Sequence, residues 1–316
     1  MNAKPIVKCN QDDCTSVTHR PDFARARAAF AAPPVTRFAP SPTGYLHLGH
    51  VVNAIYTWGV TRALGGRVLL RVEDHDRIRS RPEFVSALLE DLDWLGFVAD
   101  DGRDPLVRQS DRNLLYEDAL DRLRREGRVY GCDCSRTDIG GERYTGRCRD
   151  RRLGEQPGLS LRVRIDPDVV HVVDLVLGRL AQTPVEQCGD LLVKDRDGQW
   201  TYQFAATIDD FRQGVTLVIR GADLESSTGR QVLLARMLGR RAAPLFLHHP
   251  LLLDTHGRKL SKSAQDTGVR ELRANGASPA KVIGTAAAAV GLIAAPTSVQ
   301  ASHVAALFDP GSPSLR

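Results

Sequence analysis

The segment from residue 35 to residue 72 restricts the possible fold more than any other part of the sequence. Its first residues, 35–38, have the pattern of a short strand, and the loop that follows contains two prolines that cannot continue a β-ladder. Apolar residues then recur at near-helical spacing until Gly65 and Gly66 end the helix, and 67–72 has the apolar density of a buried strand. This order of strand, loop, helix and strand opens a nucleotide-binding sheet. We therefore predict an α/β fold with a Rossmann-type, doubly wound parallel sheet.

Composition excludes several classes of protein. With 42% hydrophobic and 26% charged residues among 316, the chain is not a collagen, a coiled coil or a wholly disordered protein. Its length suits about two domains, or one large α/β body with an insertion. The longest nearly apolar run, 282–295, is too short to span a bilayer. The first residues are polar and charged and contain no apolar core before a cleavage site, so we expect no secretory signal and a cytoplasmic location.

Positive charge is concentrated in one segment. The formal net charge is +5, and between residues 122 and 152 ten arginines accompany five acidic residues, an excess equal to that of the whole chain. A local basic stripe favours a polyanion such as a nucleic acid. A solvated helix face would have the same composition, so charge by itself leaves both interpretations open.

Periodicity predicts the remaining elements. We expect helices at 82–95, 111–125, 227–238 and 279–294, and strands at 159–165, 171–177, 190–194, 215–220 and 245–253. A charged loop, 254–263, follows the last strand.

Two histidines stand at the start of the first long helix. His47 and His50 are three residues apart, so they share a helix face, and they lie where backbone N–H groups and the helix dipole attract phosphate. Gly49 lacks the side chain that would block a nucleotide at close approach. Two such imidazoles can stabilise the charge that builds on a pentavalent α-phosphate. Taken alone, the pair would equally suit a metal site or an ordinary surface.

A second motif lies more than two hundred residues further along the chain. Lys259 and Lys262 belong to Lys-Leu-Ser-Lys-Ser, and two lysines with two hydroxyl groups on a flexible loop suit a mobile clamp on a triphosphate. His-Leu-Gly-His followed by this motif resembles the HIGH and KMSKS signatures of class I aminoacyl-tRNA synthetases. The resemblance implies catalytic roles for His47, His50, Lys259 and Lys262, and ATP contacts at His47, Gly49, His50 and Lys262.

Neighbouring motifs narrow the resemblance. Residues 37–44, Arg-Phe-Ala-Pro-Ser-Pro-Thr-Gly, and 71–76, Arg-Val-Glu-Asp-His-Asp, resemble glutamyl- and glutaminyl-tRNA synthetases, as do parts of 202–228. A glutamate pocket needs cations for two carboxylates, an acid for the ammonium group and a hydroxyl, and open α/β sheets bind ligands at strand ends. The resemblance implies glutamate contacts at Arg37, Phe38, Ala39, Pro40, Ser41, Glu73, Tyr202 and Arg220, with Glu73 facing the ammonium group. Which arginine binds which carboxylate stays open.

Three of the six cysteines form a cluster in the basic segment. Cys132, Cys134 and Cys148 offer three thiolates, which with a fourth donor fit tetrahedral zinc and would brace a loop-rich insertion. Tyrosine is not a usual zinc ligand, and free buried thiols are the alternative. The pattern Cys-x-Cys…Tyr-x-x-x-Cys nevertheless resembles the zinc site in the acceptor-end insertion of a shortened glutamyl synthetase paralogue. The resemblance implies one structural Zn²⁺ held by Cys132, Cys134, Tyr144 and Cys148.

The distance from the second motif to the end of the chain narrows the family further. After Ser263 there remain 53 residues, too few for the body with which bacterial glutamyl-tRNA synthetases read the anticodon. Over about 35–292 the sequence therefore resembles the glutamyl-Q tRNA(Asp) synthetase family, the truncated paralogues. The resemblance implies activation of L-glutamate by ATP without tRNA, and its transfer to queuosine at the wobble position of tRNA(Asp), giving glutamyl-queuosine.

The expected domain organisation follows from these motifs. It comprises an N-terminal tail (1–34), a first catalytic half (35–130), a zinc-binding insertion (131–190), a second catalytic half with the Lys-Leu-Ser-Lys-Ser loop (191–263) and a short helical C-terminal segment without an anticodon-binding domain (264–316). Cys9 and Cys14 belong to the predicted tail.

The implied reaction has two steps. The α-carboxylate of glutamate attacks the α-phosphorus of ATP in line, while Mg²⁺, the His-Leu-Gly-His helix and Lys262 neutralise developing charge and pyrophosphate leaves. A cyclopentene hydroxyl of queuosine then attacks the glutamyl-adenylate, and no side chain is an evident general base for that step. The basic segment around the zinc site would hold the backbone of the tRNA. We expect a monomer without membrane contacts.

Three other functions compete with this prediction. The first is a glutamyl-tRNA synthetase that charges the 3′ end of tRNA(Glu) with a separate anticodon-binding subunit. The second is a catalytically silent RNA-binding relative, which the intact motifs disfavour. The third is a nucleotidylyltransferase that does not act on tRNA, which would leave the glutamate pocket unexplained.

Overall fold

The computed structural model describes residues 21–141, 143–252 and 268–308. Strand β1 (Val35–Phe38) pairs in parallel with β2 (Arg67–Val72), and helix α2 (Leu48–Ala63) connects the two. β3 (Val107–Arg108) extends the sheet in parallel beyond β2. The predicted unit of strand, loop, helix and strand is therefore confirmed.

A second run of strands continues on the other side of β1. Parallel pairs join β9 (Leu217–Gly221) to β10 (Leu245–His249) and β10 to β6 (Val170–Asp174), and the antiparallel β7 (Gly178–Gln182) completes the edge. The Thr216 amide donates to the Val35 carbonyl at 2.8 Å, so β9 lies alongside β1. β2 and β3 thus lie on one side of β1, whereas β9, β10 and β6 lie on its other side. This reversal in the order of the strands creates the switch point where such sheets bind ligands.

Helices cover this sheet, and none in the described part of the chain is long and apolar enough to cross a membrane. The α-helices besides α2 are α1 (Phe23–Ala29), α3 (Pro82–Leu95), α4 (Asn113–Arg125), α5 (Arg136–Ile139), α6 (Pro184–Gln187), α7 (Tyr202–Arg212), α8 (Thr228–Met237), α9 (Val269–Ala274) and α10 (Pro279–Ala289). Three 3₁₀ helices are η1 (Gln109–Asp111), η2 (Ala222–Ser227) and η3 (Ala301–Phe308).

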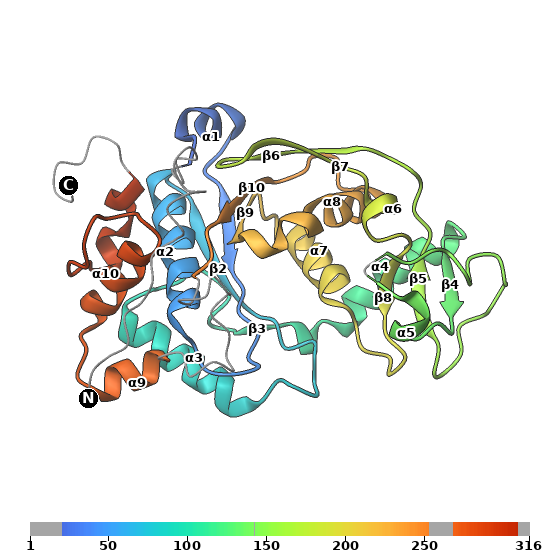
Figure 1. The fold of residues 1–316 in the computed structure, drawn as a ribbon, viewed down its shortest axis with the longest axis horizontal. Coiled ribbons are helices and arrows are strands. Elements are labelled where there is room, and N and C mark those ends of the chain that lie inside the picture. The colour runs from blue at the N-terminus through green and yellow to red at the C-terminus, as the bar shows by residue number, and fades with distance from the viewer. Residues whose placement is uncertain (1–20, 142, 253–267, 309–316) are drawn as a thin grey trace.

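Both faces of the sheet are buried. Successive side chains of a strand point to opposite faces, and here both sets belong to apolar clusters. Leu217, Ile219 and Leu247 pack in one apolar cluster with residues of α2 and α10, whereas Val218 and Phe246 pack in another with residues of α7 and α8. Figure 1 shows α2 lying between β2 and the red α10. The α/β class with a parallel sheet is therefore confirmed.

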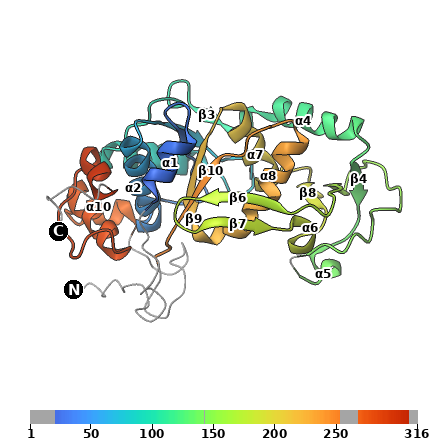
Figure 2. The same cartoon turned by 90° about the horizontal axis from the view of Figure 1, so that it is seen from above.

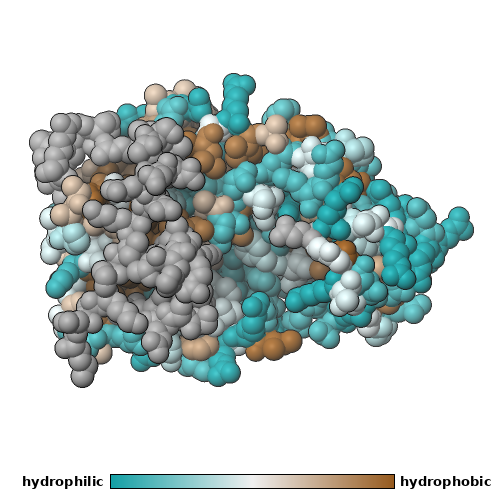
Figure 3. Space-filling view, viewed as in Figure 1, coloured by the Kyte–Doolittle hydropathy of each residue, from teal (hydrophilic) through white to brown (hydrophobic). Residues whose placement is uncertain are grey.

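The insertion lies at the opposite end of the molecule from α10 (Figures 1 and 2). There β4 (Val129–Cys132), β5 (Ser160–Val163) and β8 (Leu191–Lys194) form an antiparallel sheet of their own. The strands β6 and β7, within the predicted insertion of 131–190, instead extend the main sheet, while β8 pairs with β5 although it follows residue 190. In the view of Figure 3 the surface over this end is mostly hydrophilic.

The end of the predicted tail differs from expectation. Residues 23–29 form α1, which begins after the N-cap Asp22 and buries Ala26 completely in the core. The Asp22 amide also donates to the Leu175 carbonyl at 2.8 Å. The Ala/Arg stretch therefore packs against the core through Ala26. Its arginines obscure this apolar contact in the sequence. Residues 1–20, with Cys9 and Cys14, lie outside the described residues.

Helix α2 carries the predicted phosphate-binding histidines, and close packing behind it fixes its place. A Cβ atom at Gly59 would lie 2.3 Å from Phe308 Cε2 and 2.9 Å from the Val304 carbonyl oxygen. Glycine at this position therefore allows η3 to approach the backbone of α2 closely.

Replacing Gly59 with alanine should lower stability, although alanine is ordinarily better in a helix by about 1 kcal/mol. The added methyl group has no room beside Phe308, and overpacking of this kind costs about 1–3 kcal/mol. Urea unfolding of Gly59→Ala measures the change. Gly154→Ala is the control, because a Cβ atom there meets nothing within 4 Å. An unfolding free energy for Gly59→Ala equal to that of the control would contradict this packing.

Candidate functional site

Two adjoining cavities lie at the switch point of the sheet. One has a volume of about 490 Å³ and lies between the start of α2 and the ends of β9 and β10. The other, of about 460 Å³, lies beside the end of β1 and the first turn of α7. His50, Asn53, Arg220 and Leu224 line both, so a ligand in one cavity would touch a ligand in the other.

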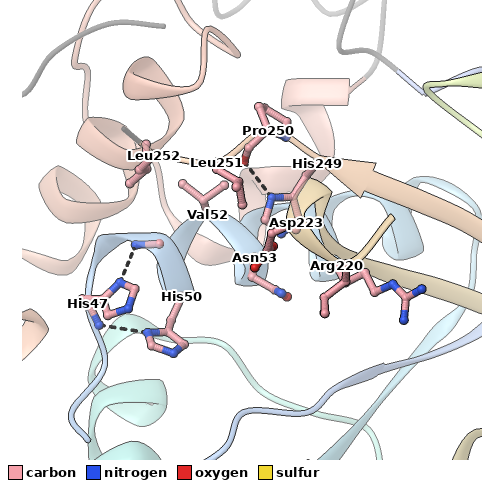
Figure 4. A pocket seen from close by; sticks show the side chains of 13 residues that line it. His47, His50, Val52, Asn53, Arg220, Asp223, His249, Pro250, Leu251 and Leu252 are labelled. Atoms are coloured by element: carbon pink, nitrogen blue, oxygen red, sulfur yellow. Dashed lines mark hydrogen bonds between the residues drawn. The ribbon is translucent and has the colours of Figure 1, made fainter. Parts of the chain in front are cut away.

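The two histidines cap the helix that borders the first cavity (Figure 4). His47 is the N-cap, and its Nδ1 accepts a hydrogen bond from the Gly49 amide at 3.1 Å. His50 Nδ1 accepts from the His47 amide, also at 3.1 Å, and the ring centroids are 4.0 Å apart. Because each Nδ1 accepts, a neutral ring carries its proton on Nε2, as assigned from this network. The predicted common face of His47 and His50 is confirmed.

Besides the predicted access for a nucleotide, there is a structural reason for glycine at position 49. A Cβ atom at this position would lie 2.8 Å from His47 Cε1 and 3.0 Å from its Nδ1. A larger residue would displace the imidazole from its capping position.

The predicted loop with Lys259 and Lys262 lies outside the described residues, but its flanking residues are placed. Before it, Leu252 lines the first cavity together with His47. After it, Gly268 forms an antiparallel β-bridge with His47, and the Val269 amide donates to the Leu46 carbonyl at 2.9 Å. Leu252 and Gly268, the described residues on either side of 253–267, therefore both lie beside the start of α2.

The second cavity brings together the residues predicted for glutamate. All eight line it, from four separate parts of the chain: Arg37, Phe38, Ala39, Pro40, Ser41, Glu73, Tyr202 and Arg220. Three of the charged side chains, Arg37, Glu73 and Arg220, are almost fully buried, with 3–4% of their surface exposed. Such burial strengthens the interaction of these charges with a bound ion.

Arg37 and Glu73 are held by a buried ion network beneath the cavity. Arg37 Nε donates to both carboxylate oxygens of Asp210, at 3.0 and 3.1 Å. Arg71, which is completely buried, pairs with Asp210 at 2.9 Å and with Glu73 at 2.9 Å. Burial by itself would raise the pKa of Asp210, but the charges of Arg37 and Arg71 outweigh it and hold this pKa below its ordinary value.

Arg220 and Tyr202 complete the polar lining. Burial lowers the pKa of Arg220 from its ordinary value. Burial also raises the pKa of Tyr202, and the nearby Glu73 charge raises it further, so its phenol stays protonated near neutral pH and can donate a hydrogen bond. The lining of the cavity thus includes the guanidinium groups of Arg37 and Arg220, the carboxylate of Glu73 and the hydroxyl of Tyr202, which together suit a bound glutamate.

Sequence reasoning missed other residues of the site. Asn53 lines both cavities from one helical turn beyond His50, and this spacing could have revealed it. Asp223 and His249 line the first cavity. Asp210 lies within the stretch 202–228, but nothing in the sequence indicates that it binds Arg37 from 173 positions away.

The three clustered cysteines meet in the insertion, as predicted. The Sγ atoms of Cys132, Cys134 and Cys148 all lie within 4.8 Å of one another, and all three residues are buried. The Tyr144 hydroxyl lies 3.6 Å from Cys132 Sγ and accepts a hydrogen bond from the Cys148 amide at 2.7 Å. Together with Tyr130 they form the small core of the insertion.

This donor set fits a zinc ion. Sulfur atoms about 2.3 Å from tetrahedral zinc stand about 3.8 Å apart, and Cys134 Sγ and Cys148 Sγ are 3.5 Å apart. A metal ion would join two segments of the insertion, 132–134 and 144–148, within its small core. The cluster can therefore hold a metal, and zinc matches its sulfur-rich chemistry best.

The basic segment is only partly neutralised. Six of its arginines form ion pairs with carboxylates: Arg122, Arg124, Arg128, Arg147, Arg149 and Arg151. The other four, Arg125, Arg136, Arg143 and Arg152, are exposed and have no ion-pair partner among the described residues. The structure thus supports a solvated face for part of the segment and leaves four outward charges for a polyanion.

Comparison with known proteins agrees with this geometry. A parallel sheet with capping histidines and buried arginines at its switch point is the arrangement expected of a class I aminoacyl-tRNA synthetase catalytic domain, an ATP-dependent ligase. The family model "tRNA synthetases class I (E and Q), catalytic domain" matches residues 34–287. The chain belongs to this family and, within it, groups with the glutamyl-Q tRNA(Asp) synthetases.

Two curated relatives and one solved structure illustrate the similarity. A glutamyl-Q tRNA(Asp) synthetase of Symbiobacterium thermophilum is 41% identical over 298 residues, which cover 86% of this chain and 91% of the relative. A glutamate–tRNA ligase of Frankia casuarinae is 39% identical, but the match covers 53% of its length. The crystal structure of a glutamate–tRNA ligase from Elizabethkingia meningosepticum in complex with its amino acid gives a TM-score of 0.71 at 25% identity, over 90% of this chain and 66% of that one.

Asp210 should contribute stability that depends on pH. Its depressed pKa means that this contribution is complete above the unfolded-state value of about 3.9 and is lost as the pH falls further. At neutral pH, Asp210→Asn should cost about 3–5 kcal/mol, because Arg37 and Arg71 lose a shared counter-ion. Unfolding free energies between pH 3 and pH 7 test this. The gap between wild type and variant should narrow below about pH 4.

The control for this experiment is Asp118→Asn, since Asp118 forms an exposed ion pair with Arg212. Its effect should be at most about 1 kcal/mol. A gap for Asp210→Asn that stays constant down to pH 3 would show that the carboxylate is not held by these two arginines.

Proposed function

We propose that this chain activates L-glutamate with ATP, without tRNA, and transfers the glutamate to queuosine at the wobble position of tRNA(Asp). The adjoining cavities carry this proposal, because one has the donors for an amino acid with two carboxylates and the other has the capping histidines that suit a triphosphate. The relative whose length is almost fully covered is named for this reaction.

The first step joins the two ligands where the cavities meet. Arg37 and Arg220 bind the carboxylates of glutamate, Glu73 binds its ammonium group, and Tyr202 and the main chain of 38–41 complete the pocket. An oxygen of the α-carboxylate then bonds to the α-phosphorus of ATP, while the bond from that phosphorus to the β-phosphate oxygen breaks and pyrophosphate leaves.

Two groups of residues stabilise the negative charge on the reacting phosphate. His47 and His50 offer Nε2–H groups at the positive end of α2, with Gly49 leaving space for the nucleotide. Lys259 and Lys262 add positive charge to the same phosphate, a role supported by the position of the flanking residues Leu252 and Gly268 beside His47. Mg²⁺ accompanies ATP and, when bound, neutralises phosphate charge.

The second step moves glutamate to the nucleoside. A cyclopentene hydroxyl of queuosine attacks the carbonyl carbon of the adenylate and gives up its proton to solvent. An ester forms, and the bond from that carbon to the phosphate oxygen breaks, so AMP leaves with this oxygen. The exposed arginines Arg125, Arg136, Arg143 and Arg152 bind the RNA backbone, since phosphate contacts of this kind supply most of the affinity for nucleic acids. We further propose that the enzyme acts as a monomer in the cytoplasm, where ATP and tRNA occur.

The position of the transferred glutamate tests the acceptor. Labelled glutamate, ATP and total tRNA that contains or lacks queuosine are incubated with the enzyme, and nuclease digestion locates the label. We expect label on the queuosine nucleotide of tRNA(Asp) and none in queuosine-free tRNA. Label on the terminal adenosine of tRNA(Glu) would instead make the chain a glutamyl-tRNA synthetase. Pyrophosphate exchange without any transfer would retain the activation step and refute the acceptor.

We also propose that the cysteine cluster binds one structural Zn²⁺ through Cys132, Cys134, Tyr144 and Cys148. The close approach of the three sulfur atoms supports this, and the ion would stabilise the insertion at residues 131–190. It would take no part in the chemistry, since neither cavity is lined by these four residues.

Cys132→Ser should reduce the zinc content of the purified protein and expose the insertion to limited proteolysis, because a hydroxyl replaces one of three thiolates. Elemental analysis and protease digestion measure the two effects. Cys188→Ser is the matched control, since Cys188 is also buried but its Sγ contacts the Pro184 carbonyl at 3.1 Å rather than the cluster. Equal zinc content in the two variants would refute Cys132 as a ligand.

A further inference from the structure

A buried histidine that lines neither cavity contacts one arginine of the glutamate pocket. His248, on β10, is 2% exposed and lies next to Arg220, on β9, through the parallel pairing of these strands. Arg220 Nε lies 3.1 Å from His248 Nε2. On the other side of the ring, His248 Nδ1 lies 2.7 Å from a carboxylate oxygen of Asp174, at the end of β6.

These contacts define the protonation of the imidazole. An arginine nitrogen can only donate, so His248 Nε2 must accept from Arg220 and carry no proton. The proton then lies on Nδ1 and is donated to Asp174. Asp174 is itself fixed, because its carboxylate accepts from the amides of Val176 and Leu177 at 2.8 and 2.7 Å, and from the His248 amide at 3.0 Å.

The remaining partners of Arg220 are also neutral. Its Nη1 donates to Gln231 Oε1 at 2.6 Å, and its Nη2 donates to Thr228 Oγ1 at 2.9 Å. Among the described residues no carboxylate forms an ion pair with Arg220, whereas Arg37 is paired with Asp210. Arg220 is therefore oriented by three uncharged acceptors, and the more distant Asp210 charge and the Tyr202 side chain act on it besides. Its positive charge thus has no ion-pair partner among the described residues, and it borders both cavities.

We propose that His248 is a positioning residue for glutamate recognition: its neutral ring, fixed by Asp174, orients Arg220 toward a substrate carboxylate without neutralising it. A carboxylate in the place of His248 would orient the guanidinium equally well but would compete with the substrate for its charge. A protonated ring would have no lone pair at Nε2 and would repel the arginine. The hydrogen bonds from His248 to Asp174 and from Arg220 to His248 thus fix the orientation of the guanidinium and leave its charge for a substrate carboxylate.

Two substitutions of His248 separate positioning from general structural support. This inference rests on the proposed activation of glutamate, and ATP–pyrophosphate exchange is the assay that measures this activation. His248→Asn retains an amide near Asp174 but does not reach Arg220, so the KM for glutamate should rise about tenfold or more, as for the loss of a hydrogen bond to a charged group. The KM for ATP and kcat should stay within roughly twofold. His248→Gln places an amide oxygen near the position of Nε2 and should restore most of the glutamate affinity.

The controls distinguish the possible failures. His171→Gln, on the exposed side of β6, should leave every constant unchanged. An unchanged KM for glutamate in His248→Asn, or equal rises for ATP and glutamate in both His248 variants, would overturn the positioning role while wild-type exchange upholds the proposed function. Absence of glutamate-dependent exchange in the wild type would refute both.

A measurement on the wild-type protein does not depend on the folding of any variant. The ¹⁵N chemical shifts of the His248 ring near pH 7 should show a protonated Nδ1 and an unprotonated Nε2. A proton on Nε2, or a doubly protonated ring, would overturn the inference.

Discussion

The buried ion network around Arg71 is the interaction on which the architecture of the site depends. Arg71 is the penultimate residue of β2, and its guanidinium binds Glu73, just after the strand, and Asp210 on α7. Asp210 in turn binds Arg37 on β1. Removal of one charge from such a buried group leaves the others uncompensated and costs several kcal/mol. The network therefore fixes two strands and one helix to each other directly beneath the second cavity.

The neighbouring Asp209 extends the same constraint to another part of the chain. Its carboxylate accepts from Arg112 at 2.6 Å, from Gln109 at 2.8 Å and from the Tyr116 hydroxyl at 2.9 Å. Two adjacent aspartates on α7 thus bind partners from β1, β2, η1 and α4. The two buried arginines of the second cavity are thus in different electrostatic states, since Arg37 has an ion-pair partner and Arg220 has none among the described residues. The paired cation shapes the pocket, and the unpaired one attracts the anionic ligand.

Much of the site was predictable because its residues occur in short, continuous motifs. His47, Gly49 and His50 follow β1 after one loop, and Glu73 follows β2 directly. The strand ends and the helix start therefore bring them together whatever the details of packing. The cysteine cluster was predictable for the same reason, since its thiols lie within 17 consecutive residues, 132–148. The parallel sheet followed from the apolar density of its strands.

Features that depend on contacts across long distances in the sequence were not predictable. The role of Asp210, the position of His248 beside Arg220, and the burial of Ala26 each depend on the final register of several strands. The strand β7 alternates exposed and partly buried residues too weakly to be recognised. Local pattern defines elements and motifs, whereas tertiary packing defines which charges meet.

The most direct test of this account is ATP–pyrophosphate exchange by the purified protein in the absence of any tRNA, with glutamate, glutamine or aspartate as the amino acid. The unpaired charge of Arg220 and the paired Arg37 predict exchange with glutamate and only background exchange with the neutral amide or the shorter acid. Exchange that requires tRNA, or exchange with glutamine equal to that with glutamate, would contradict the account.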